Sequence, residues 1–225
     1  MTAIGGPPAG VTVVATLADA LRAPSDVVVD YTTPQLVKEN VLLALSLGRH
    51  VVVGTSGLSV ADYRDIDQAA RAAKRGVIAA GNFSITATLL KRFALEAARY
   101  VPDVEVIDYA SASKPDVPSG TARELAEELA RIDRKPTAKP VAELFGPRET
   151  RGAAIGETTP VQVHSLRLPS YVIACEAIFG APDERLTIRH DAGASAAPYV
   201  AGTLLAVRRV ADAQGLRRGL DTVLS

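Results

Sequence analysis

The segment VVVDYTTPQLVKENVLLALSLGRHVVVGTSG, residues 27–57, decides the fold. Two short runs rich in valine, Val27–Tyr31 and His50–Val53, flank a stretch from Gln35 to Leu47 in which apolar residues recur every three to four positions. This pattern predicts a strand, an amphipathic helix that stops at Gly48, and a second strand. Continuous apolar strands joined by a helix are typical of a parallel sheet that is buried on both faces.

The same alternation continues on both sides of this segment. It predicts strands at Val11–Val14 and Val77–Ala80, and helices at Leu17–Leu21 and Tyr63–Lys74;. The fold class is therefore α/β, and residues 1–82 are expected to form a partial Rossmann-like dinucleotide-binding domain. We expect the segment 206–225 to pack back onto this domain.

A different pattern begins after Ala80 and predicts an α+β second domain over residues 83–205. Its expected helices are Ser84–Tyr100, Gly120–Ile132 and Ala194–Ala213, and its expected strands are Val104–Tyr109, Val161–Leu168, Tyr171–Phe179 and Arg185–His190, with a long loop over 133–160;. Turn signals between the last three strands favour antiparallel pairing. We therefore expect a mixed sheet of about four strands.

Composition excludes several functional classes. Lys plus Arg and Asp plus Glu both total 25, so no bulk charge favours nucleic acid or anionic lipid, and aromatic residues are too few, at 4%, for base stacking;. The single cysteine, Cys175, excludes a disulfide framework and a cysteine-rich metal site;. There is neither an apolar run of about 18 residues nor a signal-peptide pattern in MTAIGGPPAG;. A soluble cytoplasmic protein without nucleic-acid or membrane partners is expected.

Loops of small polar residues follow three of the predicted parallel strands. They are Tyr31–Pro34, Gly54–Gly57 and Gly81–Ser84. Ligands bind beyond the carboxyl ends of such strands, where glycine permits close backbone approach and Thr, Ser and Asn offer hydrogen-bonding groups. Each loop taken alone is better explained as a turn with a helix cap. Three of them along one sheet edge favour a ligand site.

A fourth segment, KPDVPSGT (114–121), leads directly into a predicted helix. Ser119 is a natural N-cap, and the free amides of Gly120 and Thr121 at the positive helix end would attract an anion. Lys114 lies close enough in sequence to neutralise a bound carboxylate or to deliver a proton. On local chemistry alone, a surface lysine before a capped helix is the better explanation.

Together these segments resemble the 4-hydroxy-tetrahydrodipicolinate (dihydrodipicolinate) reductase family of bacterial lysine and diaminopimelate synthesis. The resemblance is carried by DYTTP (30–34), VVVGTSG (51–57), AAGNFS (79–84) and, most specifically, KPDVPSGTA (114–122). It implies an oxidoreductase that uses NADPH or NADH to reduce a small dicarboxylate. It also implies a homotetramer built through the sheet of the second domain.

The resemblance also implies roles for individual residues. The nicotinamide end of the cofactor would contact Gly54, Thr55, Ser56, Ala80, Gly81, Asn82 and Phe83. The substrate would be bound by Ser111, Gly120 and Thr121, and Lys114 would be the catalytic lysine.

The sequence departs from the family pattern at three places. The family's G-x-x-G-x-M-G turn is not matched by GGPPAG (5–10), its His-His pair is replaced by Ala110 and Ser111, and its Gly-Glu-His is replaced by Ile173-Ala174-Cys175. His164 and His190 fall on predicted strands and are interpreted as structural. Tyr109 or Ser111 are possible substitutes for the missing proton donor. A related reductase with a different imine-type or carboxylate substrate, and a non-catalytic oligomeric relative, therefore remain as alternatives.

Overall fold

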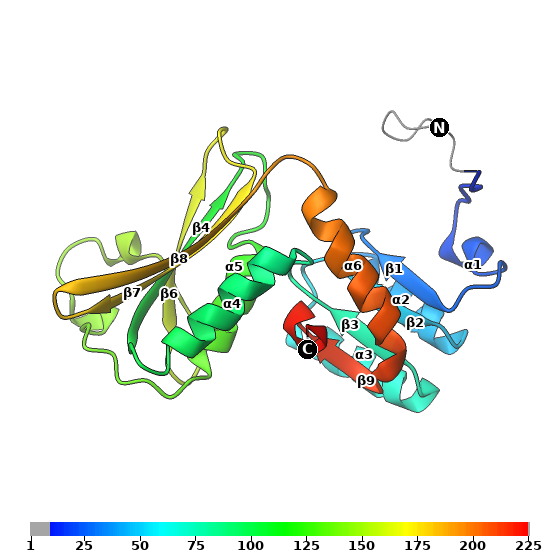
Figure 1. Ribbon diagram of the computed structural model, residues 1–225, viewed down its shortest axis with the longest axis horizontal. Coiled ribbons are helices and arrows are strands. Elements are labelled where there is room, and N and C mark those ends of the chain that lie inside the picture. Colours follow the sequence, from blue (N-terminus) through cyan, green and yellow to red (C-terminus); the bar gives the residue numbers. More distant parts are fainter. Residues whose placement is uncertain (1–9, 225) are drawn as a thin grey trace.

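The computed structural model describes residues 10–224, which form two β-sheets with their own helices (Figure 1). The first sheet is entirely parallel, with the order β1 (Val27–Asp30), β2 (His50–Val53), β3 (Gly76–Ala79) and β9 (Gly215–Arg218). The predicted strand–helix–strand unit is therefore confirmed, and a strand from late in the chain completes the sheet.

Alternate residues of these strands enter two separate cores. Val51 and Val77 pack with α2 (Val37–Ser46) and α3 (Val60–Ala73), whereas Val52 and Ile78 pack against α6 (Ala197–Arg209) on the other face. Because successive side chains of a strand point to opposite faces, helices are needed on both sides. The predicted short helix is also present as α1 (Leu17–Ala20).

The prediction of a strand at Val11–Val14 is wrong. These residues form no strand, and Val11 and Val13 are 79% and 76% exposed. A run of β-branched residues becomes a strand only where it packs against a sheet, and among the described residues none pairs with this segment.

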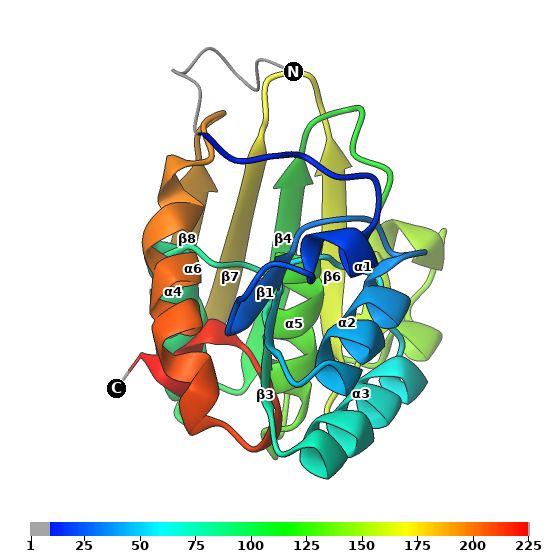
Figure 2. The same cartoon turned by 90° about the vertical axis from the view of Figure 1, so that its right-hand side faces the viewer.

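The second sheet has five strands, one more than expected. Its order is β5 (Ala153–Ile155), β6 (Val161–Arg167), β4 (Asp103–Ala110), β7 (Ile173–Ala181) and β8 (Glu184–Ala192). The extra strand β5 lies in the predicted 133–160 loop, which also holds 3₁₀ turns at Val141–Glu143 and Arg148–Arg151. Figure 2 shows the long strands of this sheet standing behind the first sheet.

The expected antiparallel pairing holds for the β7–β8 hairpin but not between β6 and β7. Strand β4 lies between them, parallel to β6 and antiparallel to β7. Turn residues indicate that the chain reverses direction between two consecutive strands. They do not indicate whether a strand from another part of the chain, here β4, lies between the two in the sheet.

Helices α4 (Ile85–Ala97) and α5 (Gly120–Ala130) cover the face of the second sheet that is turned toward the first sheet (Figure 1). Their apolar residues, including Leu90, Leu125 and Leu129, pack with Val106 and Phe179 of the strands. The start of α5 therefore lies between the two sheets.

The predicted final helix is shorter than expected, and it is followed by a 3₁₀ turn at Val210–Asp212. Tyr199, Leu205 and Ala206 of α6 pack on the first sheet, so this packing begins before residue 206. The domain bounds 1–82 with 206–225 and 83–205 stay a prediction. No helix in the described part of the chain has the length and apolar character needed to cross a membrane.

Candidate functional site

A cleft of about 400 Å³ opens beyond the carboxyl ends of β2 and β3 and faces the start of α5. It brings together all four of the segments singled out in the sequence. Its lining includes Pro34, Thr55, Ser56, Gly57, Ala80, Gly81, Asp116, Pro118 and Gly120. Of the predicted cofactor residues, Thr55, Ser56, Ala80 and Gly81 line the cleft.

The buried carboxylate of Asp30 organises the first two loops. It accepts hydrogen bonds from the backbone amide of Thr32 at 3.0 Å, from Asn40 Nδ2 at 2.9 Å and from Thr55 Oγ1 at 2.7 Å. Burial raises the pKa of Asp30, but these hydrogen bonds outweigh it and lower the pKa overall;. Because its hydroxyl is held by Asp30, Thr55 offers the cleft chiefly its backbone.

Gly54 and Phe83 support the cleft without lining it. A Cβ at Gly54 would lie 2.1 Å from the ring of Tyr31, so only glycine allows this ring to cover the loop. The Tyr31 ring meets Phe83 edge-on at 5.9 Å, and its hydroxyl hydrogen-bonds Thr203 of α6 at 2.8 Å. Phe83 itself is 2% exposed and belongs to the core.

Asn82 joins the loop after β3 to the start of α5. Its Nδ2 donates to Thr121 Oγ1 at 3.0 Å, and its Oδ1 accepts from the Ser84 amide at 2.8 Å. The side chains of Asn82 and Thr121 are thus both engaged within the protein. Thr121 therefore has a structural contact that its place in the motif did not reveal.

The first turn of α5 has the geometry expected of an anion site. Ser119 caps the helix by accepting from the Ala122 amide at 3.3 Å, and the amides of Gly120 and Thr121 follow in the first turn, where N–H groups lack intrahelical acceptors;. The fully buried Asp108 accepts from the Ser119 amide at 3.0 Å and from Arg167 at 2.8 Å. This pair holds the helix start against the second sheet.

Lys114 does not itself line the cleft. Its Nζ lies 2.7 Å from Asp116 Oδ1, and Asp116 does line the cleft. The Asp116 carbonyl accepts from Arg167 at 2.8 Å, so the loop is fixed at this point. An anionic ligand in the cleft could replace Asp116 as the partner of Lys114.

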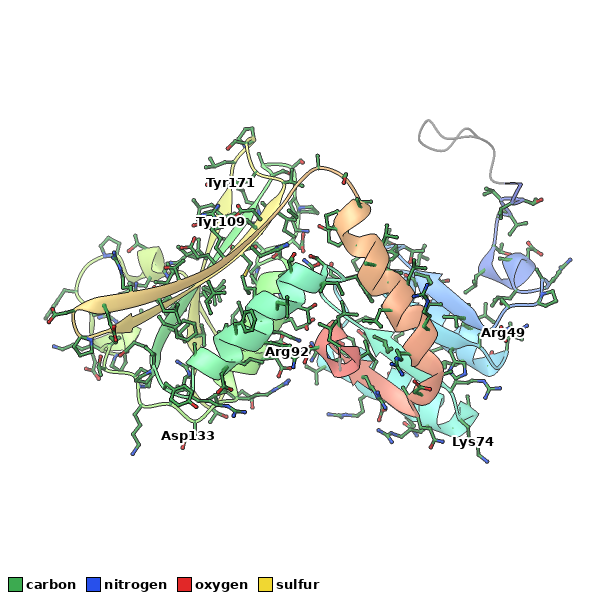
Figure 3. All side chains as sticks on the ribbon, viewed as in Figure 1. Arg49, Lys74, Arg92, Tyr109, Asp133 and Tyr171 are labelled. Carbon is green, nitrogen blue, oxygen red and sulfur yellow. The ribbon has the colours of Figure 1, made fainter. Side chains whose placement is uncertain are left out.

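The proposed substitutes for the missing histidine are not brought into the cleft. The Tyr109 hydroxyl donates to Glu176 at 2.9 Å, and the Arg189 guanidinium lies over its ring. Tyr109, which is labelled in Figure 3, follows Asp108 on β4, so the two side chains point to opposite faces of the sheet;. Burial and the Glu176 carboxylate raise the pKa of Tyr109 to about 12. Ser111 hydrogen-bonds Ser113 at 3.0 Å.

All three histidines have contacts within the protein, and the interpretation of His164 and His190 as structural stays a prediction. His164 pairs with Glu105 at 2.7 Å, and His190 lies 3.4 Å from Ser84 Oγ with its pKa lowered by burial. His50 accepts the Gly76 amide at Nδ1 at 2.9 Å. None of the three is in the lining of the cleft.

Sequence reasoning missed the charged side chains at the far end of the cleft. Arg218 of β9 lies over the ring of Tyr63, 4.4 Å from its centroid, and pairs with Glu127 at 3.2 Å. It also missed Glu124, which lines the cleft and pairs with Lys91. The burial of Lys91 could have been predicted, because this residue follows Ala87 by four positions and precedes Ala94 by three on the buried face of α4;.

The cleft fits the nicotinamide end of a dinucleotide. Its volume falls in the range of small-molecule pockets, about 300–1,000 Å³, and it lies at the strand ends where parallel sheets bind cofactors;. Small residues, Ser56, Gly57, Ala80 and Gly81, leave room for a flat ring. Over residues 10–224 no strand-to-helix turn carries a G-x-x-G-x-M-G sequence, and residues 5–9 of GGPPAG lie outside the described part.

Family models and curated relatives agree with this geometry. The models for the N-terminus and the C-terminus of dihydrodipicolinate reductase match residues 1–83 and 86–224. The chain is 39% identical over 200 residues to a 4-hydroxy-tetrahydrodipicolinate reductase of Desulfitobacterium hafniense, covering 89% of this chain and 73% of the relative. It is 38% identical over 222 residues to that of Moorella thermoacetica, covering 98% and 81%.

Solved structures show the same fold. A dipicolinate-bound dihydrodipicolinate reductase from Paenisporosarcina sp. TG-14 superposes with a TM-score of 0.65 at 32% identity, covering 88% of this chain and 74% of that one. GenD2 from gentamicin A biosynthesis has a TM-score of 0.62 at 15% identity, covering 95% and 77%, and shows the fold alone. The chain therefore belongs to the dihydrodipicolinate reductase family of NAD(P)H-dependent oxidoreductases.

Proposed function

We propose that the protein reduces 4-hydroxy-tetrahydrodipicolinate to tetrahydrodipicolinate in this cleft, as a step of lysine and diaminopimelate biosynthesis, with NADH or NADPH as the reductant. The main observation in support of this proposal is that the strand-end loops and the KPDVPSGTA segment line one cleft. The strand-end loops, through Thr55, Ser56, Ala80 and Gly81, face the nicotinamide end of the cofactor. Gly54, Asn82 and Phe83 set the shape of these loops from behind.

The start of α5 would hold a carboxylate of the substrate. The amides of Gly120 and Thr121, together with the positive end of the helix dipole, favour an anion at this point. The dipicolinate of the Paenisporosarcina structure is a dicarboxylate of the same class as the substrate proposed for this chain. Ser111 lies three residues before Lys114 on the same loop, and its assignment to the substrate rests on the family resemblance, since it does not line the cleft.

The reduction consumes one hydride and one proton, and loss of the 4-hydroxyl group releases water. When bound, the reduced nicotinamide supplies the hydride. The proton is assigned to Lys114, whose ammonium would exchange Asp116 for the substrate carboxylate when the cleft is filled;. With Tyr109 bonded to Glu176, Lys114 is the leading proton donor in the described part of the chain.

Replacement of Lys114 by alanine tests this assignment. We expect kcat/KM for oxidation of the reduced nicotinamide to fall by at least about 100-fold, which corresponds to about 3 kcal/mol of transition-state stabilisation. Lys139→Ala removes the same charge from an exposed position in the 133–160 loop and serves as the control. A Lys114→Ala variant within about threefold of wild type would assign the proton to another group.

The replacement of the family's histidine pair by Ala110 and Ser111 favours a second candidate, a reductase of the same chemistry with a different imine-type substrate. Ala110 is fully buried on the α5 side of β4, so the position carries neither the bulk nor the ring nitrogens of histidine. Turnover of other cyclic imine carboxylates faster than 4-hydroxy-tetrahydrodipicolinate would favour this candidate. Failure of the wild-type chain to bind reduced cofactor in a fluorescence titration would favour a non-catalytic relative.

We further propose that the protein is cytoplasmic and assembles as a homotetramer through the open face of the second sheet. Helices α4 and α5 cover only one face of this sheet, and Ile107 and Ile178 on the opposite face are only half-buried. This open face of the mixed sheet also carries the ion pair Glu176–Arg189, and a combination of apolar and charged side chains is typical of protein–protein interfaces;. Light scattering at tens of micromolar tests the assembly, and a monomer would contradict it.

A further inference from the structure

Three charged side chains from separate segments meet beside the cleft. They are Lys91 of α4, Glu124 of α5 and Asp221 of the 3₁₀ turn Leu220–Val223. Lys91 Nζ lies 2.6 Å from Glu124 Oε1 and also contacts Asp221 Oδ1, and the side chains of Lys91 and Glu124 are only 9% and 15% exposed. We call these three residues the junction cluster.

Glu124 connects the junction cluster to the loop that follows β3. Its second oxygen, Oε2, accepts the amide hydrogen of Gly81 at 2.7 Å, and both residues line the cleft. A carboxylate that accepts from an amide while facing an ammonium group makes a stronger hydrogen bond than a neutral acceptor does. The bond between Thr121 and Asn82 adds a second connection one turn earlier on the same helix.

Two glycines provide the space in which the junction cluster closes. A Cβ at Gly81 would lie 2.7 Å from the carbonyl oxygen of Gly120 and 2.9 Å from Glu124 Oε2. A Cβ at Gly219 would lie 2.3 Å from Asp221 Oδ1 and 2.6 Å from Lys91 Nζ. The two halves of the fold therefore approach each other more closely here than side chains would allow.

Neighbouring contacts hold the C-terminal segment in the same place. The Gly219 amide donates to the carbonyl of Ala79, the last residue of β3, at 2.8 Å. Arg92, the residue after Lys91, donates to the carbonyl of Leu224 at 3.2 Å and is labelled on α4 in Figure 3, beside the C-terminal segment. Helix α4, helix α5 and the end of β3 are thus joined at one point.

We propose that Glu124 is a positioning residue of the cleft. By accepting a hydrogen bond from the Gly81 amide, it sets the spacing between the loop after β3 and the start of α5. The proposal rests on the proposed function, in which that loop faces the nicotinamide and the helix start holds the substrate carboxylate. A change in this spacing separates the hydride donor from its acceptor. Geometry of this kind governs rate strongly, since small displacements of bound reactants lower the reaction rate.

Kinetics of full-length variants test the proposal. We expect Glu124→Ala to raise KM for the reduced cofactor and to lower kcat/KM at least tenfold at a temperature where the variant is folded. Glu124→Gln keeps an oxygen that accepts from Gly81 and should recover most of this loss. Asp221→Asn removes charge from the junction cluster without touching the bond to Gly81, so it should lower Tm while KM stays within about twofold.

The matched control is Glu128→Ala, because Glu128 lies on the same helix and pairs with Arg131 on the surface. It should leave the kinetics within about twofold of wild type. Wild-type KM and kcat in Glu124→Ala, or a Glu124→Gln variant as impaired as Glu124→Ala, would overturn the positioning role. A wild-type chain that neither binds nor oxidises NADH or NADPH would instead overturn the proposed function, and the inference with it.

Discussion

The most buried carboxylate in the described chain, that of Asp108, lies beneath the start of α5 and forms an ion pair with Arg167. Asp108 is fully buried, and its carboxylate also accepts from the Ser119 amide and from Ser165 Oγ. Removing one partner of such a pair leaves the other charge uncompensated in a low dielectric. The pair is therefore a sensitive point for both stability and the geometry of the proposed carboxylate site.

A double-mutant cycle measures this sensitivity. We expect Arg167→Met to lower the free energy of unfolding by about 3 kcal/mol or more, because the carboxylate of Asp108 stays buried without its cation. Combining it with Asp108→Asn should cost clearly less than the sum of the two single changes. Urea unfolding of the four proteins gives the coupling, and additive losses would show that the two side chains act independently.

Single residues were predicted unevenly from the sequence. Gly120 and Ser119 were identified because a cap and a glycine at a helix start have local sequence signatures. The roles of Asp108, Glu124 and Arg218 depend on contacts between segments far apart in the chain, and no local pattern contains them. The contact of Tyr109 with Glu176 was likewise not predicted, because it joins two strands that are far apart in the chain.

At the scale of elements, helix α6 crosses the loop after β3 at a glycine. A Cβ at Gly202 would lie 2.0 Å from the carbonyl oxygen of Phe83 and 2.7 Å from Leu220 Cδ2. Helix propensity alone would favour alanine over glycine by about 1 kcal/mol. The backbone contact opposes this preference, because neither α6 nor the loop can move without disturbing the core between them.

Gly202→Ala should therefore destabilise the protein by about 2 kcal/mol, in spite of its better helix propensity. Gly180→Ala in β7 is the control, since a Cβ there meets nothing within 4 Å, and its effect should stay below about 1 kcal/mol;. Chemical denaturation measures both. A more stable Gly202→Ala variant would mean that α6 does not lie this close to Phe83.

Helices and strands in which apolar residues recur at a regular spacing were predicted well. The order of the strands in the second sheet was not. The helix over 37–46 and the strands β1, β2 and β3 follow from apolar spacing, which is a property of the local chain, whereas β9 has no such pattern and was not predicted;. The insertion of β4 between β6 and β7 is decided by packing against α4 and α5, which the sequence does not display locally. At Val11–Val14 the opposite holds. The local sequence favours a strand, but no strand in the described part of the chain pairs with it.

For the whole molecule, two histidines that are at least partly buried make stability depend on pH. Burial is the main cause that lowers the pKa of both His50 and His190 below the ordinary value of about 6.5;. Below that value the unfolded chain binds protons that the folded chain does not, so stability falls as the pH drops through 6.5 toward the lowered pKa values, and is regained as the pH rises. Both histidines act in the same direction.

His50→Asn isolates one of these contributions, because an amide oxygen can accept the Gly76 amide without titrating;. We expect the variant to lose less stability than wild type between pH 7.5 and pH 5.5 (about one unit either side of the ordinary histidine value). Urea midpoints at the two pH values give the comparison. An equal loss in both proteins would mean that His50 titrates normally in the folded state.

The pairing of β3 with β9 also governs the order of events during synthesis. When a ribosome has made β1, β2 and β3, the sheet they begin still lacks the strand that borders β3, because residues 215–218 emerge only after the whole second sheet. Until then the border of β3 is an unpaired strand edge, which invites association with other chains. The second sheet, whose five strands lie within residues 103–192, can complete its pairing first. The cleft therefore forms after the second sheet, once residues 215–218 have been made and β9 has paired with β3.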